Sequence, residues 1–125
     1  MKEIINTQNA PSPIGPYSQA VMIGGVLYTS GQIAINPQTN ELEIEDIKSE
    51  TKLVMENLKA VLIEARMDFS NVIKCSIFIS DMNNFAQINE VYGTYFSSNF
   101  PARETVEVAC LPKNVNVEIS AIAVK

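Results

Sequence analysis

The chain has 125 residues, of which 46% are hydrophobic and 18% charged, as is typical of one globular domain. We therefore expect a single domain over residues 1–125. Its 9 Lys and Arg against 14 Asp and Glu give a formal net charge of −5. Nucleic-acid binders usually present a basic face to the phosphates, so this balance disfavours RNA or DNA as a partner. The chain has no histidine, which excludes Ser-His-Asp and Cys-His catalysis and any His-based metal site.

The two cysteines and the N-terminus limit the chemistry and the location further. Cys75 and Cys110 are far apart and form no CxxC pair, so neither a zinc site nor a disulfide framework is supported. No apolar run approaches the roughly 20 residues that span a bilayer. The first residues include Glu3 and no apolar segment, so we expect no signal peptide, a cytoplasmic location and no membrane partner. Catalysis would have to use carboxylates, Arg, Lys, Ser, Thr, Tyr or backbone groups.

The N-terminal third predicts a turn-rich entry followed by a β-hairpin. Residues 11–16 contain three prolines and a glycine, which excludes regular helix or central strand. Strands are expected over 17–23 and 26–31, joined by a two-residue Gly-Gly turn at 24–25. Residues 36–40 form a loop of turn-forming residues.

Two helices and three more strands are predicted after the hairpin. Apolar residues at helical spacing indicate a helix over 46–66, with charged residues on its other side. A strand is expected over 72–80, and a second helix begins near Phe85. Strands over 103–110 and 115–124 complete the chain. The apolar residues expected on one face of the 72–80 strand are Ile73, Cys75, Ile77 and Ile79.

The order strand-strand-helix-strand-helix-strand-strand predicts an α+β sandwich, with one sheet and two helices on one of its faces. Two helices can cover only one side of the sheet, yet the last strand is apolar on both faces. The sheet could curl over its own loops, but a second copy of the chain explains the pattern better. We therefore expect a homo-oligomer.

Arg103 and Glu118 are the residues best suited to chemistry. The other arginine, Arg66, closes the first helix, where a cation is usually structural. Arg103 enters a strand beside apolar residues and shares a face with Thr105, while Glu104 lies on the other face; we expect Arg103 to be partly desolvated. It could form an ion pair or a bidentate anion clamp. Glu118 lies where a polar strand face becomes apolar, which could raise the pKa of its carboxyl or leave it paired with Arg103.

Four separated motifs resemble the Rid family (reactive intermediate deaminases, the YjgF-type proteins, also labelled L-PSP endoribonucleases). They are Ile14-Gly15-Pro16-Tyr17-Ser18-Gln19-Ala20, Tyr28-Thr29-Ser30-Gly31-Gln32, Asp81-Met82-Asn83-Asn84-Phe85, and Pro101-Ala102-Arg103 with its continuation through Leu111-Pro112-Lys113 to Val117-Glu118-Ile119. The resemblance spans essentially the whole chain. It implies a chorismate-mutase-like (bacillus-type) α+β fold with one mixed sheet, assembled as a homotrimer with ligand clefts between subunits.

The resemblance also implies an activity. It is the hydrolysis of 2-aminoacrylate-type enamines and imines (2-iminobutanoate and 2-iminopropanoate) to 2-keto acids and ammonia, with no cofactor and no metal. By position, Arg103 matches the family's carboxylate-binding arginine and Glu118 its cleft glutamate, and these are the expected catalytic residues. The expected substrate-binding residues are Tyr17, Ser30, Gly31, Asn89, Arg103 and Thr105.

Three positions depart from the family pattern. Glu104 and Thr105 follow the arginine where the family usually has a small residue and then cysteine, and Cys110 stands where many relatives carry arginine. Thr105 keeps a hydroxyl but loses the thiol, which the chemistry below does not need.

The expected mechanism uses Arg103 to hold the substrate carboxylate and Glu118 to deprotonate water and return the proton to the leaving amine. A non-catalytic regulatory trimer that binds 2-keto acids is an alternative. RNA cleavage is another, against which the acidic balance and the lack of histidine count.

Overall fold

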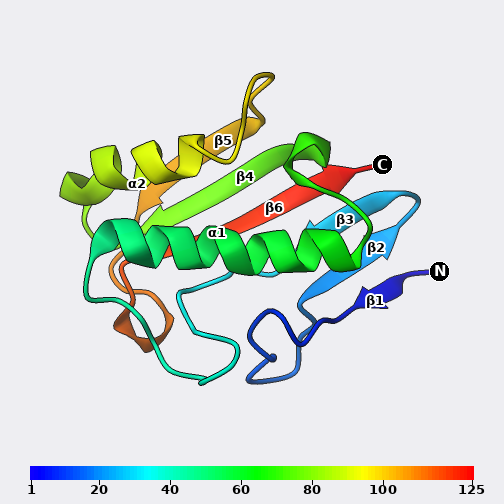
Figure 1. Ribbon diagram of the computed structural model, residues 1–125, viewed down its shortest axis with the longest axis horizontal. Helices are drawn as coiled ribbons and strands as arrows, with labels where there is room; N and C mark the ends of the chain where they lie inside the picture. The colour runs from blue at the N-terminus through cyan, green and yellow to red at the C-terminus, as the bar shows by residue number, and fades with distance from the viewer.

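Six strands form one mixed sheet in the computed structural model, which describes residues 1–125 (Figure 1). The strands are β1 (Glu3–Ile5), β2 (Ala20–Ile23), β3 (Val26–Thr29), β4 (Val72–Ile79), β5 (Ala102–Glu107) and β6 (Val117–Val124), and the helices are α1 (Ile47–Glu64) and α2 (Phe85–Gly93). Short 3₁₀ turns precede β4, α2 and β6. The strands lie in the order β1-β2-β3-β6-β4-β5, and all neighbours are antiparallel except β4 and β5.

The predicted α+β class is confirmed, with one strand added to the predicted order. The short β1 precedes the hairpin and pairs with β2 at one edge of the sheet. Its three residues are too few to show a period-2 pattern in the sequence. The parallel pair of β4 and β5 is connected through α2, as a crossover between parallel strands requires.

The predicted hairpin is confirmed as β2 and β3, with shorter strands than expected. Gly24 and Gly25 have φ angles of +58° and +79°, and two successive left-handed residues are the geometry that a tight hairpin favours. Residues 17–19 and 30–31, which were predicted as strand, lie outside the ladder. The Ser30 N–H still donates to Gln19 O at 2.9 Å, and Tyr17, Gln19, Ser30 and Gly31 line the cavity described below.

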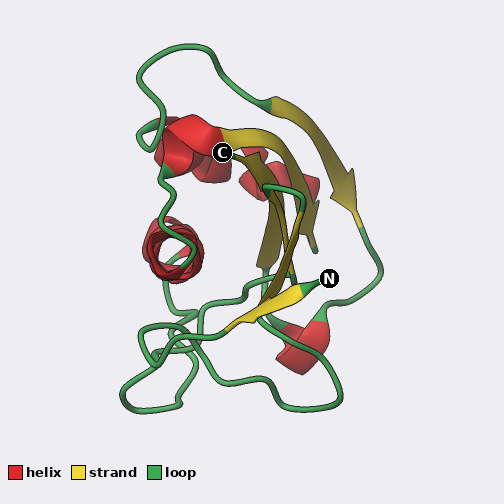
Figure 2. Ribbon diagram, turned by 90° about the vertical axis from the view of Figure 1, so that its right-hand side faces the viewer, coloured by secondary structure: helices red, strands yellow, loops and turns green.

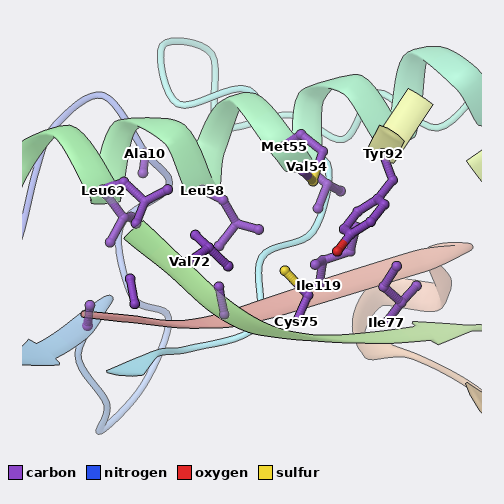
Figure 3. Close-up of a cluster of buried hydrophobic side chains, with 14 of the residues drawn as sticks. Ala10, Val54, Met55, Leu58, Leu62, Val72, Cys75, Ile77, Tyr92 and Ile119 are labelled. Atoms are coloured by element: carbon purple, nitrogen blue, oxygen red, sulfur yellow. The ribbon is translucent and has the colours of Figure 1, made fainter. Parts of the chain in front are cut away.

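Helix α1 confirms the prediction over 46–66 to within two residues at each end. It begins after Asp46, whose carboxylate accepts a hydrogen bond from the Ser49 backbone N–H at 2.9 Å. Val54, Leu58 and Leu62 are fully buried on its inner side and face the strands (Figure 3). None of the helices is long and apolar enough to cross a membrane.

One predicted core residue lies on the surface. Ile73 is 52% exposed, so the prediction that it shares the buried face with Cys75 is wrong. A register irregularity between Val72 and Lys74, where β4 pairs with β6, interrupts the alternation. As a result Val72 and Cys75, three residues apart, both point into the core.

The two faces of the sheet differ in what covers them. Figure 2 shows α1 nearly end-on, on one side of the strands. The covered side, called here the helix face, holds the fully buried Leu27, Val117 and Ile119. The opposite side, called here the open face, carries no helix and is half-buried or exposed; its central residues are Val26, Tyr28, Phe78, Glu118, Ser120, Ile122 and Val124.

Candidate active site

Arg103 lies on the helix face, beside α2. It pairs in register with Cys75, whose side chain is fully buried beneath the helices, and residues paired across neighbouring strands share a face. The Arg103 Nη1 donates a hydrogen bond to Asn89 Oδ1 at 2.7 Å. The register also places Thr105 on the helix face and Glu104 on the open face, as strand alternation predicted.

The guanidinium of Arg103 has no acidic partner. The two ion pairs of the structure join Lys48 to Glu90 and Lys74 to Glu104. Arg103 lies on the edge strand β5 and is exposed in the single chain. An exposed guanidinium held by an amide and free of carboxylates can bind an anion through its remaining N–H groups.

Glu118 lies on the open face. It pairs in register with Phe78 and stands between Val117 and Ile119, which are fully buried on the helix face. No Lys or Arg forms an ion pair with it, and burial raises the pKa of the Glu118 carboxyl above its ordinary value. Of the two outcomes that the sequence left open for Glu118, the structure supports a raised pKa and not a pair with Arg103.

Gly31 lies directly against the Glu118 carboxylate. A Cβ atom at residue 31 would be 1.9 Å from Glu118 Oε2 and 2.7 Å from its Cδ. Two backbone hydrogen bonds fix this approach, from Gln32 N to Ile119 O at 2.8 Å and from Ile119 N to Gln32 O at 3.1 Å. Only glycine leaves the space that the carboxylate occupies.

A cavity of about 520 Å³ opens beside Glu118. The predicted residues Tyr17, Ser30, Gly31 and Glu118 all line it, which brings together four residues from three separate segments. Further lining residues that sequence reasoning missed include Ile14, Ile33, Ile35 and Lys113. Ile14 and Lys113 belong to the motifs that resemble the Rid family but were not selected as site residues, whereas Ile33 and Ile35 lie in a loop without a periodic pattern.

Tyr17 and Ser30 are held by backbone groups of the same wall. The Tyr17 hydroxyl accepts a hydrogen bond from Ile14 N at 3.2 Å, and the residue is 53% exposed. The Ser30 hydroxyl donates to Ser18 O at 2.6 Å. The Tyr17 hydroxyl can therefore still donate its proton to a ligand in the cavity, and the Ser30 hydroxyl oxygen can still accept a hydrogen bond from one.

Two buried amides fix the loops that form the cavity. Gln19 is 1% exposed; its Nε2 donates to Thr7 O at 3.0 Å and to Pro11 O at 2.9 Å, and its Oε1 accepts from Thr7 N at 2.7 Å. Asn57 of α1 donates from Nδ2 to Ile33 O at 3.1 Å and to Ile35 O at 3.0 Å. Both walls are therefore tied to the core, although neither amide stands out in the sequence.

The predicted site residues thus form two groups on opposite faces of the sheet. Arg103, Asn89 and Thr105, called here the Arg103 group, lie on the helix face. Tyr17, Ser30, Gly31 and Glu118, called here the Glu118 group, surround the cavity. The structure therefore does not bring Arg103 and Glu118 together within one chain, and an internal salt bridge between them is excluded.

The residues that depart from the family pattern have separate environments. The Thr105 hydroxyl is buried without a hydrogen-bond partner. Glu104 accepts a hydrogen bond from the Ser76 hydroxyl and pairs with Lys74 at 2.8 Å, away from Arg103. Cys110 is a free and exposed thiol. The structure brings together no group of three or more acidic or thiol side chains that could hold a metal ion.

Comparison with known proteins agrees with this fold. The family model described as endoribonuclease L-PSP matches residues 7–125. A RutC family protein of Pyrococcus horikoshii is 53% identical, over all of this chain and 99% of its own length. TdcF of Escherichia coli, whose name designates it a candidate reactive intermediate deaminase, is 47% identical over all of this chain and 98% of its own length.

The solved structures define the class of protein through the fold. The crystal structure of E. coli TdcF with bound serine superposes with a TM-score of 0.95 at 46% sequence identity, covering 98% of each chain. This chain, with its one mixed six-stranded sheet and two helices, therefore has the same architecture as TdcF. The chain belongs to the Rid family, which comprises the YjgF, RutC and L-PSP proteins.

Proposed function

We propose that this protein hydrolyses reactive enamine and imine intermediates of the 2-aminoacrylate type, 2-iminobutanoate and 2-iminopropanoate, to 2-keto acids and ammonia. The observation that carries the proposal is the pair of groups described above. One is a guanidinium without an acidic partner, oriented by Asn89. The other is a carboxyl of raised pKa at a cavity. The guanidinium would bind the substrate carboxylate and the carboxyl would transfer protons, and hydrolysis of a carboxylate-bearing imine requires both.

The two groups would form one site between copies of the chain in a homotrimer. A site that needs both Arg103 and Glu118 is incomplete in one chain, because the sheet separates them. The open face supports this assembly, since Tyr28 is 49% exposed beside the half-buried Ile122 and Val124. A second copy on this face would remove apolar surface from water and supply the missing group.

The chemistry follows from this arrangement. Protonation of the enamine β-carbon, with loss of a proton from the nitrogen, gives the imine, and water adds to the imine carbon to form a carbinolamine. Arg103 and Asn89 of one copy would hold the carboxylate and fix the imine carbon near Glu118 of the next. Glu118 would take a proton from the attacking water and give it to the imine nitrogen, which forms the carbinolamine. Glu118 would then move the proton of the carbinolamine hydroxyl to the same nitrogen, so that the C=O bond forms, the C–N bond breaks and ammonia leaves.

The remaining residues would complete the binding site. Gly31 has no side chain and so leaves room for the Glu118 carboxylate, while Tyr17 and Ser30 provide hydroxyl groups on the cavity wall. We assign the unpartnered hydroxyl of Thr105 to the half of the site that holds Arg103. The bound serine in TdcF, a relative, supports a small ligand that carries a carboxylate.

The proposed activity is tested by supplying 2-aminoacrylate from serine with a dehydratase and following the release of keto acid and ammonia. Wild-type protein is expected to accelerate release, and Glu118→Gln is expected to lose most of that acceleration. Release at the uncatalysed rate, with a 2-keto acid still bound, would point to a regulatory binding protein. Cleavage of RNA that persists in Arg103 and Glu118 variants would indicate a contaminant.

A further inference from the structure

Three residues on one side of α2 surround the guanidinium of Arg103. Phe85, Asn89 and Tyr92 are spaced four and three residues apart, so they form one stripe along the helix. The Arg103 Cζ lies 5.5 Å from the centre of the Phe85 ring and 5.1 Å from the centre of the Tyr92 ring. Asn89, between them, accepts the hydrogen bond from Nη1. We call Phe85 and Tyr92 the aromatic cradle.

Both distances fall within the range in which a cation is attracted to the face of an aromatic ring. This attraction holds a guanidinium without using its N–H donors, whereas a carboxylate partner would occupy them. One donor of Arg103 goes to Asn89, and no acidic side chain takes the others. The cradle therefore fixes the cation and leaves its donors free for an anion.

The Tyr92 ring is itself held firmly. Tyr92 is 3% exposed, and in Figure 3 its side chain points from α2 into the core near Cys75 and Ile119. Its ring centre lies 5.0 Å from that of Phe96. A buried ring supported in this way cannot turn aside, so the surface it offers to Arg103 is fixed.

We infer that Phe85 and Tyr92 are positioning residues, which lower the cost of binding the substrate carboxylate by fixing Arg103 in its binding conformation. An arginine side chain loses several rotatable bonds of freedom when it binds a ligand, and a prior constraint reduces that loss. This inference rests on the proposed function, because it takes Arg103 as the group that holds the carboxylate. It extends that function to the face of α2 that organises the clamp.

The test uses Phe85→Leu in the full-length protein, which removes one ring but keeps an apolar residue at the start of the helix. The dissociation constant for 2-ketobutyrate is measured by calorimetry. The Nε–H signal of Arg103 is followed by NMR, and Arg66 supplies the only other arginine signal as an internal reference. Ring currents from the cradle displace the Arg103 signal, so the spectrum reports the contact independently of activity.

We expect Phe85→Leu to weaken 2-ketobutyrate binding by about three- to tenfold and to move the Arg103 signal toward that of an unstacked arginine. The value of KM should rise with little change in kcat. Phe85→Tyr, which restores a ring, should recover both the affinity and the signal.

Phe69→Leu is the matched control. Phe69 is also a partly buried phenylalanine packed on the same core, but it contacts Tyr95 and Phe96 instead of Arg103. It should lower the melting temperature without changing the dissociation constant or the Arg103 signal. Equal weakening by Phe69→Leu and Phe85→Leu would overturn the inference, because the effect would then be one of stability.

An unchanged dissociation constant in Phe85→Leu would also overturn the inference, whether or not the Arg103 signal moves. Failure of the proposed function gives a different result. Wild-type protein would then not accelerate keto-acid release from 2-aminoacrylate, while the dissociation constants for 2-ketobutyrate would still test the role of the cradle. If wild-type protein does not bind 2-ketobutyrate at all, the inference fails together with the assignment of Arg103.

Discussion

Arg103 and Glu118 lie on opposite faces of the same sheet. Arg103 pairs in register with Cys75, which faces the helices, whereas Glu118 pairs with Phe78, which faces away from them. A side chain on one face of a sheet cannot reach across it, because the strands and their buried side chains intervene. The two residues can therefore act on one substrate only if a second copy of the chain brings them together.

Replacing Gly31 with alanine should disturb the site more than the fold. The new Cβ would overlap the end of the flexible Glu118 side chain, which can rotate away at little cost. Because displacement of a catalytic group by about 1 Å can cost on the order of 100-fold, we expect kcat/KM to fall by about 10- to 100-fold. The melting temperature should change little.

Gly93→Ala is the matched control for that variant. A Cβ at residue 93 meets nothing within 4 Å, so this substitution should alter neither activity nor stability appreciably. In a Glu118→Gln background, Gly31→Ala should remove no further activity, since the group it displaces no longer works. An additive loss in the double variant would contradict the assigned contact.

The stability of the protein should report the environment of Glu118. Burial raises the pKa of its carboxyl, so the folded chain holds this proton more tightly than the unfolded chain. Glu118 therefore contributes most to the free energy of unfolding at low pH. This contribution falls as the pH rises from the carboxyl pKa of the unfolded chain through the higher pKa of the folded chain. Glu118→Gln should be more stable than wild type at pH 7, with the difference shrinking toward pH 4.

Urea unfolding at both pH values measures this difference, and Glu41→Gln, at an exposed residue, serves as the reference. A Glu118→Gln variant that is less stable than wild type at neutral pH would show that the carboxylate has a partner that favours its charge. Protonation of Glu118 should also affect activity. We expect kcat/KM to fall on acidification at a pH above the ordinary glutamate pKa, because Glu118 then can no longer act as a base.

Arg103→Lys keeps the positive charge but replaces the planar guanidinium with an ammonium group. A lysine ammonium cannot form the paired hydrogen bonds that a guanidinium makes with a carboxylate. We expect a loss of about 1.5–3 kcal/mol of transition-state binding, measured as kcat/KM in the coupled dehydratase assay. Release of keto acid as fast as with wild type would contradict the role of Arg103.

Thr105→Val separates a role in binding from a role in folding. The hydroxyl is buried without a partner, so its removal at constant shape should leave the free energy of unfolding unchanged or raise it by up to about 1 kcal/mol. If Thr105 contacts the substrate or a bound water as proposed, activity should nevertheless fall by about three- to tenfold. Full activity in a stable Thr105→Val protein would remove Thr105 from the site.

Local patterns were sufficient to predict most of the fold. The Gly24–Gly25 turn, the apolar stripe of α1 and the alternation in β6 each follow from a strong periodic or conformational preference. The errors have local causes: β1 is too short to show a period, and the bulge at Ile73 breaks one. Family resemblance, not periodicity, selected Tyr17, Ser30 and Gly31.

The separation of Arg103 from Glu118 could not be predicted from the sequence. Alternation shows which neighbours share a face within one strand, but the register between β5, β4 and β6 is a long-range property. The same limit applies to the contacts of Gln19 and Asn57, whose hydrogen bonds reach loops 8 to 24 residues away. These contacts exist only once the chain has folded.

Subunit mixing tests the composite site most directly. Arg103→Lys and Glu118→Gln proteins are each unfolded, mixed in equal amounts and refolded together, and ammonia release from 2-aminoacrylate is then measured. If each site takes Arg103 from one copy and Glu118 from the next, random assembly restores about a quarter of the sites and hence about a quarter of wild-type activity. Mixed oligomers, verified by mass spectrometry, that remain as inactive as the separate variants would contradict the composite site.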